Sequence, residues 1–413
     1  MEQAPAIGDR ERLVRRNTHR LVVAQGAIQL SFPPLLVIGA VAASEMTGND
    51  GATGLLWAVY FCAAAVGAIA IGRWMDRVGR RPGLLLAYAL SAVAGVGSAL
   101  AIVADSFALL LACAIPFGLA SGGANLGRAA VADMYPPQER GRAIGWLLAI
   151  GTIGAIGGPL LVALLQDVAE ARGLDPWVLP WIVVPVGAIG AIVAVLGVRP
   201  DPRDLAVVET GAPAGGRPPR ELLRVPAFRI AVLAAAVGQV VMVGIMGVTP
   251  TALHALHHGG TAISVVISVH VAGMFAFAPL IGRWMDRTGH RSGLVWGCVV
   301  SITGAMITAT EASAWIIGLG LFAIGIGWSA TFLGATAVIS DATQPDERAG
   351  ALGFTDLLVS LCSAVAGLAG GLVLEAYGFG PLGIGLAAVV AVVLLIVLRM
   401  RDPGVPGRVA SGA

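Results

Sequence analysis

The sequence predicts an all-α integral membrane protein whose twelve transmembrane helices form two pseudo-symmetric six-helix bundles. Of its 413 residues, 57% are hydrophobic and 12% are charged, whereas about a quarter of the residues in a typical soluble domain carry charge. Apolar runs long enough to cross a bilayer recur along the chain. The decapeptide GRWMDRVGRR at residues 72–81 also returns as GRWMDRTGHR at residues 282–291, with eight of its ten residues identical.

Twelve apolar runs reach the roughly 20 residues that a membrane-crossing helix needs. The runs are continuous and do not alternate with polar residues, which favours helices over a transmembrane β-barrel. We expect the spans at residues 20–43, 52–72, 83–104, 107–132, 142–166, 179–198, 228–254, 261–281, 293–311, 314–340, 350–375 and 380–399.

The arginines predict the orientation. All 26 basic residues are Arg, and 24 of them lie in the termini or in the even-numbered connections; the other two are Arg128, in the fourth span, and Arg172. Basic residues gather on the cytoplasmic side of a membrane protein. We therefore expect a multi-pass protein of the bacterial cytoplasmic (plasma) membrane with both termini cytoplasmic. The first apolar run has no convincing cleavage site, so we interpret it as an uncleaved span.

A second repeated segment supports the two halves. Residues 131–145 align with residues 339–353 at an offset of 208, and both contain an Asp, a Pro, a Glu-Arg pair and a Gly in the same order. Between the halves, residues 199–224 combine proline, glycine and charge, which predicts a flexible linker. The expected parts are a six-helix bundle at 1–198, a cytoplasmic linker at 199–227, a second six-helix bundle at 228–400 and a cytoplasmic tail at 401–413.

Composition and motifs argue against several other classes of protein. The net charge of +2 gives no indication of a nucleic-acid partner. We find no phosphate loop or nucleophile elbow, so we expect neither an enzyme nor a cofactor. Four cysteines lie singly in apolar runs and predict no disulfide framework and no CxxC metal site; they are Cys62, Cys113, Cys298 and Cys362.

The two repeated segments resemble those of the major facilitator superfamily, a family of twelve-span transporters. The decapeptide is similar to that family's cytoplasmic connection between the second and third helices. Residues 136–142, PPQERGR, are similar to its connection between the fourth and fifth helices. The resemblance covers essentially the whole chain. It implies a secondary transporter, acting as a monomer, that binds a small molecule between its halves and works by alternating access.

The fifth span resembles a pattern, G-x8-G-x3-G-P, of the twelve-span drug:proton antiporter group within that superfamily. Small residues at these spacings allow close helix packing, and proline bends a helix. The alternative is a generic glycine-rich interface, since the chain contains 57 glycines. The matching residues are Gly145, Gly154, Gly158 and Pro159.

The charged residues of the repeated segments predict a conformational latch on the cytoplasmic face. A carboxylate such as that of Asp76 can accept hydrogen bonds from nearby arginines or lie at the N-terminus of a neighbouring helix. The alternative is that the arginines only set the topology. We expect the first copy to matter more, because its ending RRP becomes HRS in the second. The expected latch residues are Gly72, Asp76, Arg77, Gly79, Arg80, Arg81, Asp133, Arg140, Gly282, Asp286, Arg287, Asp341 and Arg348.

Polar residues inside the spans are candidates for the substrate or proton pathway. Gln25 and Gln29 share one face of the first helix, and Gln239 occupies the position that corresponds to Gln29 in the second half. Asn125 is a further polar residue in the fourth span. These side chains either line a central cavity or form hydrogen bonds between helices.

Ionisable residues are costly within a membrane, so two of them are functional candidates. Arg128 either has a structural role, in which it reaches the cytoplasmic surface or pairs with Asp133, or it binds anionic groups or gates the cavity. Asp356, in the eleventh span, either cycles a proton or binds the cytoplasmic arginines as a residue near the helix start.

The histidines form two groups. His254, His257 and His258 lie near the outer end of the seventh span, and His270 lies near the middle of the eighth. Tyr60 and His270 occupy corresponding positions in the two halves, and we expect both to face the cavity. The histidines are either solvated, or act in proton coupling or pH gating, or handle a metal, for which the outer three are weak candidates.

The leading hypothesis is that the protein is a proton-coupled exporter of small amphipathic molecules. One alternative is an importer or facilitator of a polar nutrient or metal ion. Another is a transport-dead membrane sensor or scaffold. The sequence does not predict the substrate, because the shape of a pocket depends on how each helix is rotated.

Overall fold

A computed structural model describes residues 7–207 and 217–400. Within these residues the fold is helical, and twelve helical segments are long and apolar enough to cross a membrane. Each predicted span corresponds to one of them, so the all-α membrane fold is confirmed. The predicted tail at 401–413 lies outside the described residues. The segments are Asp9–Thr47, Gly51–Val78, Arg80–Val103, Phe107–Asp133, Arg142–Ala171, Leu179–Leu196, Pro226–Ala255, Gly260–Thr288, His290–Thr308, Ala314–Ala342, Gly350–Tyr377 and Phe379–Leu398.

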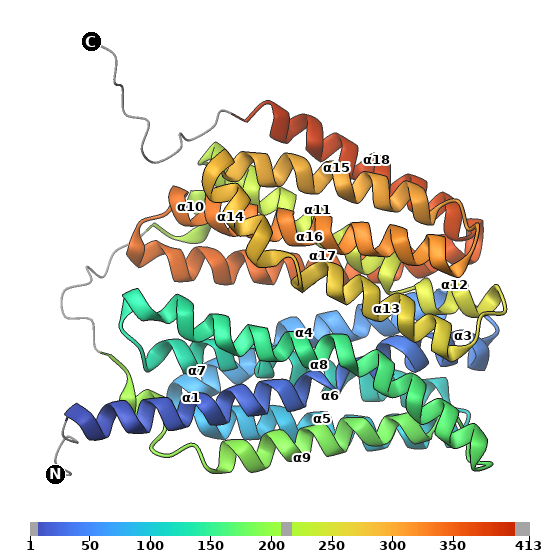
Figure 1. Cartoon of the computed structure of the whole chain (residues 1–413), viewed down its shortest axis with the longest axis horizontal. Coiled ribbons are helices and arrows are strands. Elements are labelled where there is room, and N and C mark those ends of the chain that lie inside the picture. The colour runs from blue at the N-terminus through green and yellow to red at the C-terminus, as the bar shows by residue number, and fades with distance from the viewer. Residues whose placement is uncertain (1–6, 208–216, 401–413) are drawn as a thin grey trace. The chain divides into compact units, whose positions relative to one another are not determined.

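Figure 1 labels most of the helices along the chain. In order they are α1 (Ile7–Gln29), α2 (Phe32–Pro34), η1 (Leu35–Gly39), α3 (Ala40–Thr47), α4 (Gly51–Val78), α5 (Arg80–Val103), α6 (Phe107–Ala124), α7 (Gly127–Asp133), α8 (Pro137–Ala171), η2 (Leu179–Ile182), α9 (Val183–Leu196), η3 (Pro202–Leu205), α10 (Pro219–Leu222), α11 (Pro226–Met246), α12 (Thr249–Ala255), α13 (Gly260–Phe275), α14 (Ala278–Thr288), α15 (His290–Thr308), α16 (Ala314–Ala342), α17 (Pro345–Tyr377) and α18 (Phe379–Leu398).

The chain forms two compact units, and each is described by itself. Most of the first six spans belong to unit 1 and most of the last six to unit 2, with parts of α4 and α13 as the exceptions. Unit 1 consists of Met1–Ala52, Val59–Thr210 and Gly259–Ser268, and unit 2 consists of Thr53–Ala58, Gly211–His258 and Val269–Ala413.

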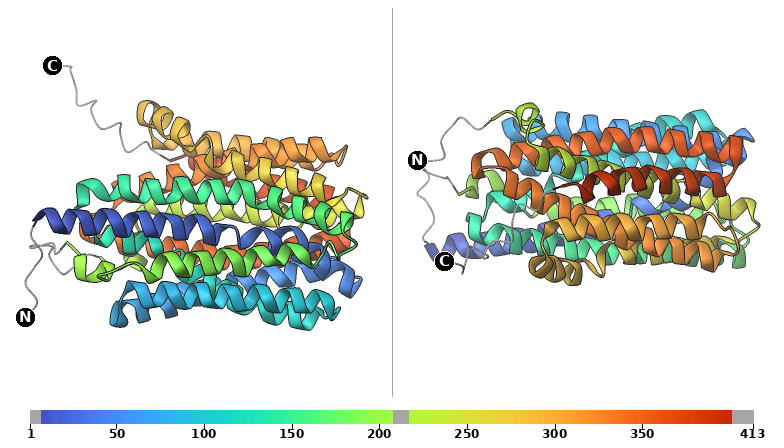
Figure 2. Two further views of the ribbon diagram at one scale, coloured as in Figure 1. Left: turned by 60° about the horizontal axis from the view of Figure 1, so that its bottom comes forward. Right: turned by 90° about the horizontal axis from the view of Figure 1, so that it is seen from above.

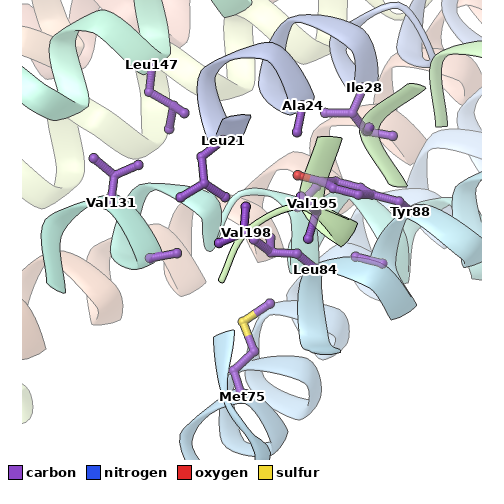
Figure 3. Packing of buried hydrophobic residues seen from close by; sticks show 14 of the residues in the cluster. Leu21, Ala24, Ile28, Met75, Leu84, Tyr88, Val131, Leu147, Val195 and Val198 are labelled. Atoms are coloured by element: carbon purple, nitrogen blue, oxygen red, sulfur yellow. The ribbon is translucent and has the colours of Figure 1, made fainter. Parts of the chain in front are cut away.

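The core of unit 1 lies where α1, α5 and α9 meet. Leu21, Ala24 and Ile28 recur every three or four residues on α1, so they share one face of that helix. Figure 3 shows this face close to Val195 of α9 and Tyr88 of α5, and all five side chains are buried. Lipid tails are as apolar as these side chains, so close packing holds the helices together within a membrane.

Close packing also depends on glycine. A Cβ atom at Gly67 of α4 would overlap the backbone of Leu119 in α6. In unit 2, α15 and α16 run side by side (Figures 1 and 2), and a Cβ atom at Gly304 would lie 2.6 Å from the carbonyl oxygen of Gly320. Such backbone contacts are typical of helices packed within a membrane. They fix the positions of neighbouring spans that carry the candidate site residues.

Within the described residues, four spans are interrupted. The first passes through Pro33 and Pro34, which lack N–H donors, into the wider helical turn of Leu35–Gly39. Interrupted spans leave backbone groups free beside the side chains that they carry. The other three interruptions lie at residues 125–126, 247–248 and 276–277.

The predicted linker is folded at both of its described ends. Beside unit 1, Pro202–Leu205 forms η3, and Asn17 Nδ2 donates a hydrogen bond to the Pro200 carbonyl oxygen at 3.0 Å. At the other end, Pro219–Leu222 forms α10. Composition predicts a flexible segment here, but contacts with helix ends order these parts. Residues 208–216 lie outside the described residues.

Candidate functional site

Arg80 joins the ends of three helices in unit 1. Its Nε atom donates a hydrogen bond to Asp133 Oδ2 at 2.8 Å, and its Nη1 atom donates one to Asp76 Oδ1 at 2.7 Å. Asp76 lies in the last turn of α4, Arg80 begins α5, and Asp133 ends α7. The Arg80 and Asp133 side chains are 19% and 28% exposed, against 65% for Asp76. Three predicted latch residues therefore meet within one unit, and Arg80 is their shared partner.

Gly79 and Asp201 fix the turn that precedes α5. Gly79 has a φ of +117°, which residues with a side chain rarely adopt, and a Cβ atom there would lie 2.7 Å from Asp201 Oδ2. Asp201 accepts hydrogen bonds from the backbone N–H groups of Arg80 and Arg81 at 3.0 and 2.8 Å. Its carboxylate thus caps the N-terminus of α5, where the helix dipole favours negative charge.

Asp201 is a residue that the sequence analysis missed. The available signal was its place in the segment RPDPRD, directly after the sixth span. The same segment contacts the end of α4, because Arg203 Nη1 donates a hydrogen bond to the Arg77 carbonyl oxygen at 3.1 Å. Part of the predicted linker therefore belongs to the network around Arg80.

The last arginine of each decapeptide caps the end of another span. Arg81 Nη2 donates a hydrogen bond to the Leu196 carbonyl oxygen at 3.0 Å, and Arg291 Nη2 donates one to the Leu398 carbonyl oxygen at 2.6 Å. Leu196 ends α9 and Leu398 ends α18. A cation at the C-terminus of a helix satisfies free carbonyl groups and complements the dipole. The two halves repeat this contact.

The other charged contacts are repeated only in part. In the second decapeptide, His290 takes the place of Arg80, and its Nδ1 atom lies 2.9 Å from Asp341 Oδ2. Within the described part of the chain, Asp286 and Arg287 have no ion pair or side-chain hydrogen bond. The opening glycines differ little: a Cβ atom at Gly72 would lie 3.4 Å from Leu126 Cδ1, and one at Gly282 would meet open space.

The arginines of the second repeated segment also bind helix ends. Arg140 Nε donates hydrogen bonds to the carbonyl oxygens of Ala132 and Tyr135, both at 3.1 Å. Arg348 Nη2 donates one to the Ser340 carbonyl oxygen at 2.9 Å. Each arginine therefore caps the span before its own helix, which is a structural contact within one unit.

Glu347 has a partner that the sequence analysis missed. Arg217 binds it in bidentate fashion, with Nε 2.7 Å from Oε1 and Nη2 3.0 Å from Oε2, and the Glu347 side chain is 2% exposed. The hydrogen bonds from Arg217, and a further one from the Gln344 backbone, lower the pKa of the Glu347 carboxyl to about 2. Arg217 precedes Glu347 by 130 residues, so no local pattern could reveal the pair.

Two glycines of the antiporter-like pattern bring α8 close to the first span. A Cβ atom at Gly154 would lie 2.7 Å from the Gly26 carbonyl oxygen, and one at Gly158 would overlap the ring of Pro33. Gly145 has open space around it. Pro159 lies inside α8, directly after Gly158.

Gln25 and Gln29 point towards α8. A Cβ atom at Gly151 would lie 3.4 Å from Gln25 Cγ and 3.5 Å from Gln29 Cγ. Gln25 is buried and Gln29 is half-buried. Both side chains therefore pack between the first and fifth spans of unit 1.

Gln239 belongs to an aromatic cluster on three helices of unit 2. Its Oε1 atom accepts a hydrogen bond from Trp328 Nε1 at 2.7 Å. The Trp328 ring stacks on Phe332 with centroids 5.1 Å apart and planes 11° apart, and it meets Phe275 edge to face at 5.9 Å. We call Gln239, Phe275, Trp328 and Phe332 the Trp328 cluster. The sequence analysis found Gln239 but missed the rings, although the four-residue spacing of Trp328 and Phe332 on one helix was a signal.

Unit 1 contains its own aromatic cluster around Tyr60. The Tyr60 ring lies 5.8 Å from that of Phe32, 5.1 Å from that of Phe61 and 6.2 Å from that of Phe117. Its hydroxyl forms a hydrogen bond with the Ser121 side chain. Tyr60 is only 4% exposed, so within unit 1 its ring serves packing more than contact with a ligand.

His270, which corresponds to Tyr60, is also fully buried. Its Nδ1 atom lies 2.6 Å from the Leu321 carbonyl oxygen, so Nδ1 carries the proton that it donates. Among the described residues, Nε2 has no hydrogen-bond partner. Such an unmade contact in a buried imidazole is costly, and the hydroxyl groups of Ser264 and Ser268 on the same helix also have no partner among the described residues.

The remaining span residues lie near helix interruptions or surfaces. Asn125 falls in the break between α6 and α7, and Arg128 Nε donates a hydrogen bond to its carbonyl oxygen at 3.2 Å. Asp356 is exposed on α17. Asp133, the expected partner of Arg128, binds Arg80.

The outer histidines lie at and after the end of α12. His254 belongs to its last turn, His257 has a φ of +62°, and His258 follows in the connection to α13. Among the described residues, no group of three His, Cys, Asp or Glu side chains is placed to hold a metal ion. Metal handling by these histidines, for which they are weak candidates, stays a hypothesis beside solvation and proton coupling.

Comparisons with known proteins agree with this architecture. The family model of the Major Facilitator Superfamily matches residues 23–258 and 231–413. An uncharacterised transporter of this type from Bacillus subtilis, YddS, is 27% identical over 88% of this chain and 85% of its own length. The riboflavin transporter RfnT of Brucella anthropi is 28% identical over 94% of this chain and 97% of its own.

Two further proteins are similar in part or in fold. Multidrug resistance protein 1 of Bacillus subtilis is 25% identical over 38% of this chain and 41% of its own length. The crystal structure of a bacterial homologue of the human lysosomal transporter Spinster covers 95% of this chain and 96% of its own, with a TM-score of 0.67 and 19% identity. Twelve apolar helices, the repeated segments and the family match together show a multi-pass membrane transporter and not an enzyme, and the chain belongs to the Major Facilitator Superfamily.

Proposed function

We propose that this transporter carries small planar heteroaromatic molecules, which stack on the Trp328 cluster during alternating access. One observation carries the proposal: the rings of Trp328 and Phe332 lie parallel within 11° beside the side-chain amide of Gln239. Aromatic side chains bind flat rings by stacking, because both partners offer a π face. The polar groups around the rings then determine which flat molecules fit.

Gln239 and Phe332 define the complementary ligand. Gln239 Oε1 is occupied by Trp328, which leaves the amide N–H groups of Gln239 as donors for an acceptor on the ligand. Phe332 is 37% exposed, so part of its ring is open to a partner. A flat ring with a carbonyl oxygen or ring nitrogen at its edge satisfies both groups.

The riboflavin transporter RfnT supports the choice of first ligands, since the similarity covers almost the full length of both proteins. A flavin has a planar ring system with carbonyl oxygens at one edge and a polar side chain. A flavin is a nutrient, and its transporter need not be an exporter. A flavin ligand therefore favours the alternative of a nutrient importer or facilitator over that of an exporter.

Flavin binding to the purified protein tests the proposal. We expect riboflavin fluorescence to be quenched saturably, and Trp328→Ala to weaken binding about tenfold, because one stacking contact is worth about 1–3 kcal/mol. Trp315→Ala is the matched control, since Trp315 lies on the same helix and is 74% exposed. Absence of saturable binding across flavins and other flat heteroaromatic compounds contradicts the proposal, as does equal weakening by both substitutions.

Proton-coupled export of amphipathic molecules is the second candidate. It is favoured by the contacts of Gly154 and Gly158 with the first span and by the similarity to multidrug resistance protein 1. His270 and Asp356 are the proposed proton carriers, because each can gain and lose a proton within a span. Proteoliposomes with an imposed pH gradient distinguish the candidates: export predicts substrate-dependent proton flux that His270→Gln or Asp356→Asn reduces, whereas flavin facilitation predicts flux without a gradient.

We further propose that the network around Arg80 lies on the cytoplasmic face and moves as one body. The distribution of arginine supports this orientation, and the network joins the ends of α4, α5 and α7. Reporter fusions at both termini in a bacterial host test the orientation: activity of a periplasmic reporter at either terminus contradicts it. A transport-dead sensor or scaffold predicts no flux of any solute in the same proteoliposomes.

A further inference from the structure

An open groove of about 1000 Å³ runs between α1 and α8 on the surface of unit 1. The residues of α1 that line it are spaced by one, three and four positions, so they form one continuous face of the helix. They extend from residue 10 to residue 23, which is roughly 20 Å along the helix axis. The groove is separate from the Trp328 cluster, which lies in unit 2.

The lining of the groove changes from charged to apolar along its length. At one end lie Glu11 and Arg15 of α1 with Glu139 and Arg142 of α8. At the other end the walls become apolar, with Val22, Val23, Trp146 and Ile150. The two candidate spans that line the groove begin at Asp9 and Arg142, so the charged end lies near the start of both spans.

The charged end contains both signs, and its charges are unpaired. Within the part of the chain that the structure describes, Glu11, Arg15, Glu139 and Arg142 make no ion pair and no side-chain hydrogen bond. All four side chains are exposed. The Arg12 side chain, by contrast, pairs with Asp9 outside the groove. Two cations and two anions without partners thus face one open space, beside Arg10, which donates hydrogen bonds to the carbonyl oxygens of Met134 and Leu205.

The apolar end is equally open. Val23 is 59% exposed and Trp146 is 60% exposed, and tryptophan is enriched where a membrane meets water. An acyl chain alone would satisfy the apolar wall and leave four charges unused. A soluble ion would bind the charges and leave the wall bare. An amphiphile with a zwitterionic head matches both ends.

We propose that this groove binds a phospholipid with a phosphoethanolamine head. The phosphate accepts hydrogen bonds from Arg15 and Arg142, because guanidinium groups bind phosphate oxygens in bidentate fashion. The primary ammonium donates to Glu11 and Glu139. One acyl chain lies along Val23, Trp146 and Ile150. This site goes beyond the proposed transport function and does not depend on it.

Because the groove contains both arginines and glutamates, it favours the phosphoethanolamine head over the heads of other common phospholipids. A phosphatidylglycerol head carries a phosphate but no cation, so it would leave both glutamates without partners. A phosphatidylcholine head carries a quaternary ammonium, which has no N–H group to donate. Both alternatives are therefore expected to bind more weakly than phosphatidylethanolamine.

Native mass spectrometry of the full-length protein, released from nanodiscs with equal parts of the three lipids, tests the site. We expect phosphatidylethanolamine to be retained at least about fivefold over each other lipid, since two charge-assisted contacts distinguish the heads. Replacing both arginines, Arg15→Ala with Arg142→Ala, should reduce its retention about tenfold. Arg12→Ala, which removes an arginine of α1 that pairs with Asp9 and does not line the groove, should change nothing.

The glutamates provide the discriminating variant. Glu11→Gln with Glu139→Gln should remove the preference for phosphatidylethanolamine over phosphatidylcholine and leave phosphate-dependent binding intact. Glu170→Gln, at the other end of α8, is its control. Equal retention of the three lipids by the wild-type protein, a preference for phosphatidylglycerol, or an unchanged preference in the double glutamine variant each overturns the proposal. Unchanged thermal unfolding of the variants excludes misfolding as the cause.

Discussion

The two decapeptides share eight of ten residues, yet their charged side chains are held differently. In the first, Arg80 binds Asp76 and Asp133, while Asp201 caps the helix that follows. In the second, His290 contacts Asp341, and Asp286 has no side-chain partner among the described residues. What the copies share is backbone geometry, with a left-handed glycine before each helix, and an arginine that caps the sixth or twelfth span.

The comparison shows that the backbone of the turn is the same in both copies, whereas the ion pairs around it differ. The glycine and the capping arginine satisfy demands of any short connection between two helices, so both copies keep them. The pair of Arg80 with Asp76 is additional and ties α5 to α4 only in unit 1, whereas the pair of Arg80 with Asp133 has a counterpart in His290 and Asp341. The first copy is therefore the better candidate for a cytoplasmic latch, and substitutions should affect the two copies unequally.

The largest difference is expected between Arg80→Ala and His290→Ala. Loss of Arg80 leaves the half-buried Asp133 carboxylate without its cation, which should lower the free energy of unfolding by about 2 kcal/mol. His290 contacts a carboxylate that is 45% exposed, so its loss should cost less than about 1 kcal/mol. Unfolding by sodium dodecyl sulfate in mixed micelles measures both values. Equal losses of unfolding free energy would show that the ion pairs of Arg80 stabilise the protein no more than the contact of His290 does.

A smaller effect is expected for Asp201→Ala, which removes the cap of α5. The loss of a side-chain cap typically costs about 1 kcal/mol, and here two backbone N–H groups lose their acceptor. Asp204→Ala is the matched control, because Asp204 lies three residues further on and is exposed. Unfolding in mixed micelles measures the free energy of unfolding of both variants. If the two values are equal, Asp201 does not stabilise the network around Arg80.

The two glutamates of the second repeated segment, Glu139 and Glu347, also differ in their contacts, and the difference predicts how stability depends on pH. Glu347 binds Arg217 and has a pKa lowered to about 2, whereas Glu139 has no side-chain partner among the described residues. A lowered carboxyl pKa adds stability above its usual value of 4.5, and this stability is lost as the pH falls from about 4.5 towards about 2.

Glu347→Gln should therefore lower the unfolding temperature at pH 7 and flatten its decline between about pH 4.5 and pH 2. The effect at pH 7 is limited, because glutamine keeps an oxygen that accepts from Arg217. Glu139→Gln is the matched control and should not reproduce this flattening. Thermal unfolding across this range measures both, and parallel profiles for Glu347→Gln and the wild-type protein would contradict the assignment.

Local sequence pattern predicted the spans and their number, because hydrophobic length and the positions of arginine are properties of single segments. It also placed Asp76, Asp133 and Gln239 among the candidates. The partners of these residues came from elsewhere in the chain: Asp201 caps a helix 120 residues earlier, and Trp328 binds Gln239 over 89 residues. Such contacts depend on how helices are rotated and packed, which periodicity does not determine. The aromatic rings were missed because glycine-rich, apolar spans contain many similar residues.

The smallest difference is expected between Asp76→Asn and Asp286→Asn. Asp76 is 65% exposed and pairs with Arg80 four residues later on the chain, a contact worth about 0.3–0.5 kcal/mol; Asp286 should contribute nothing measurable. Transport is the more sensitive readout if Asp76 helps to position Arg80. We expect Asp76→Asn to slow solute flux in proteoliposomes more than Asp286→Asn at equal protein content. If Arg80 needs only Asp133, both variants will transport equally, and the latch will reduce to the single pair of Arg80 and Asp133.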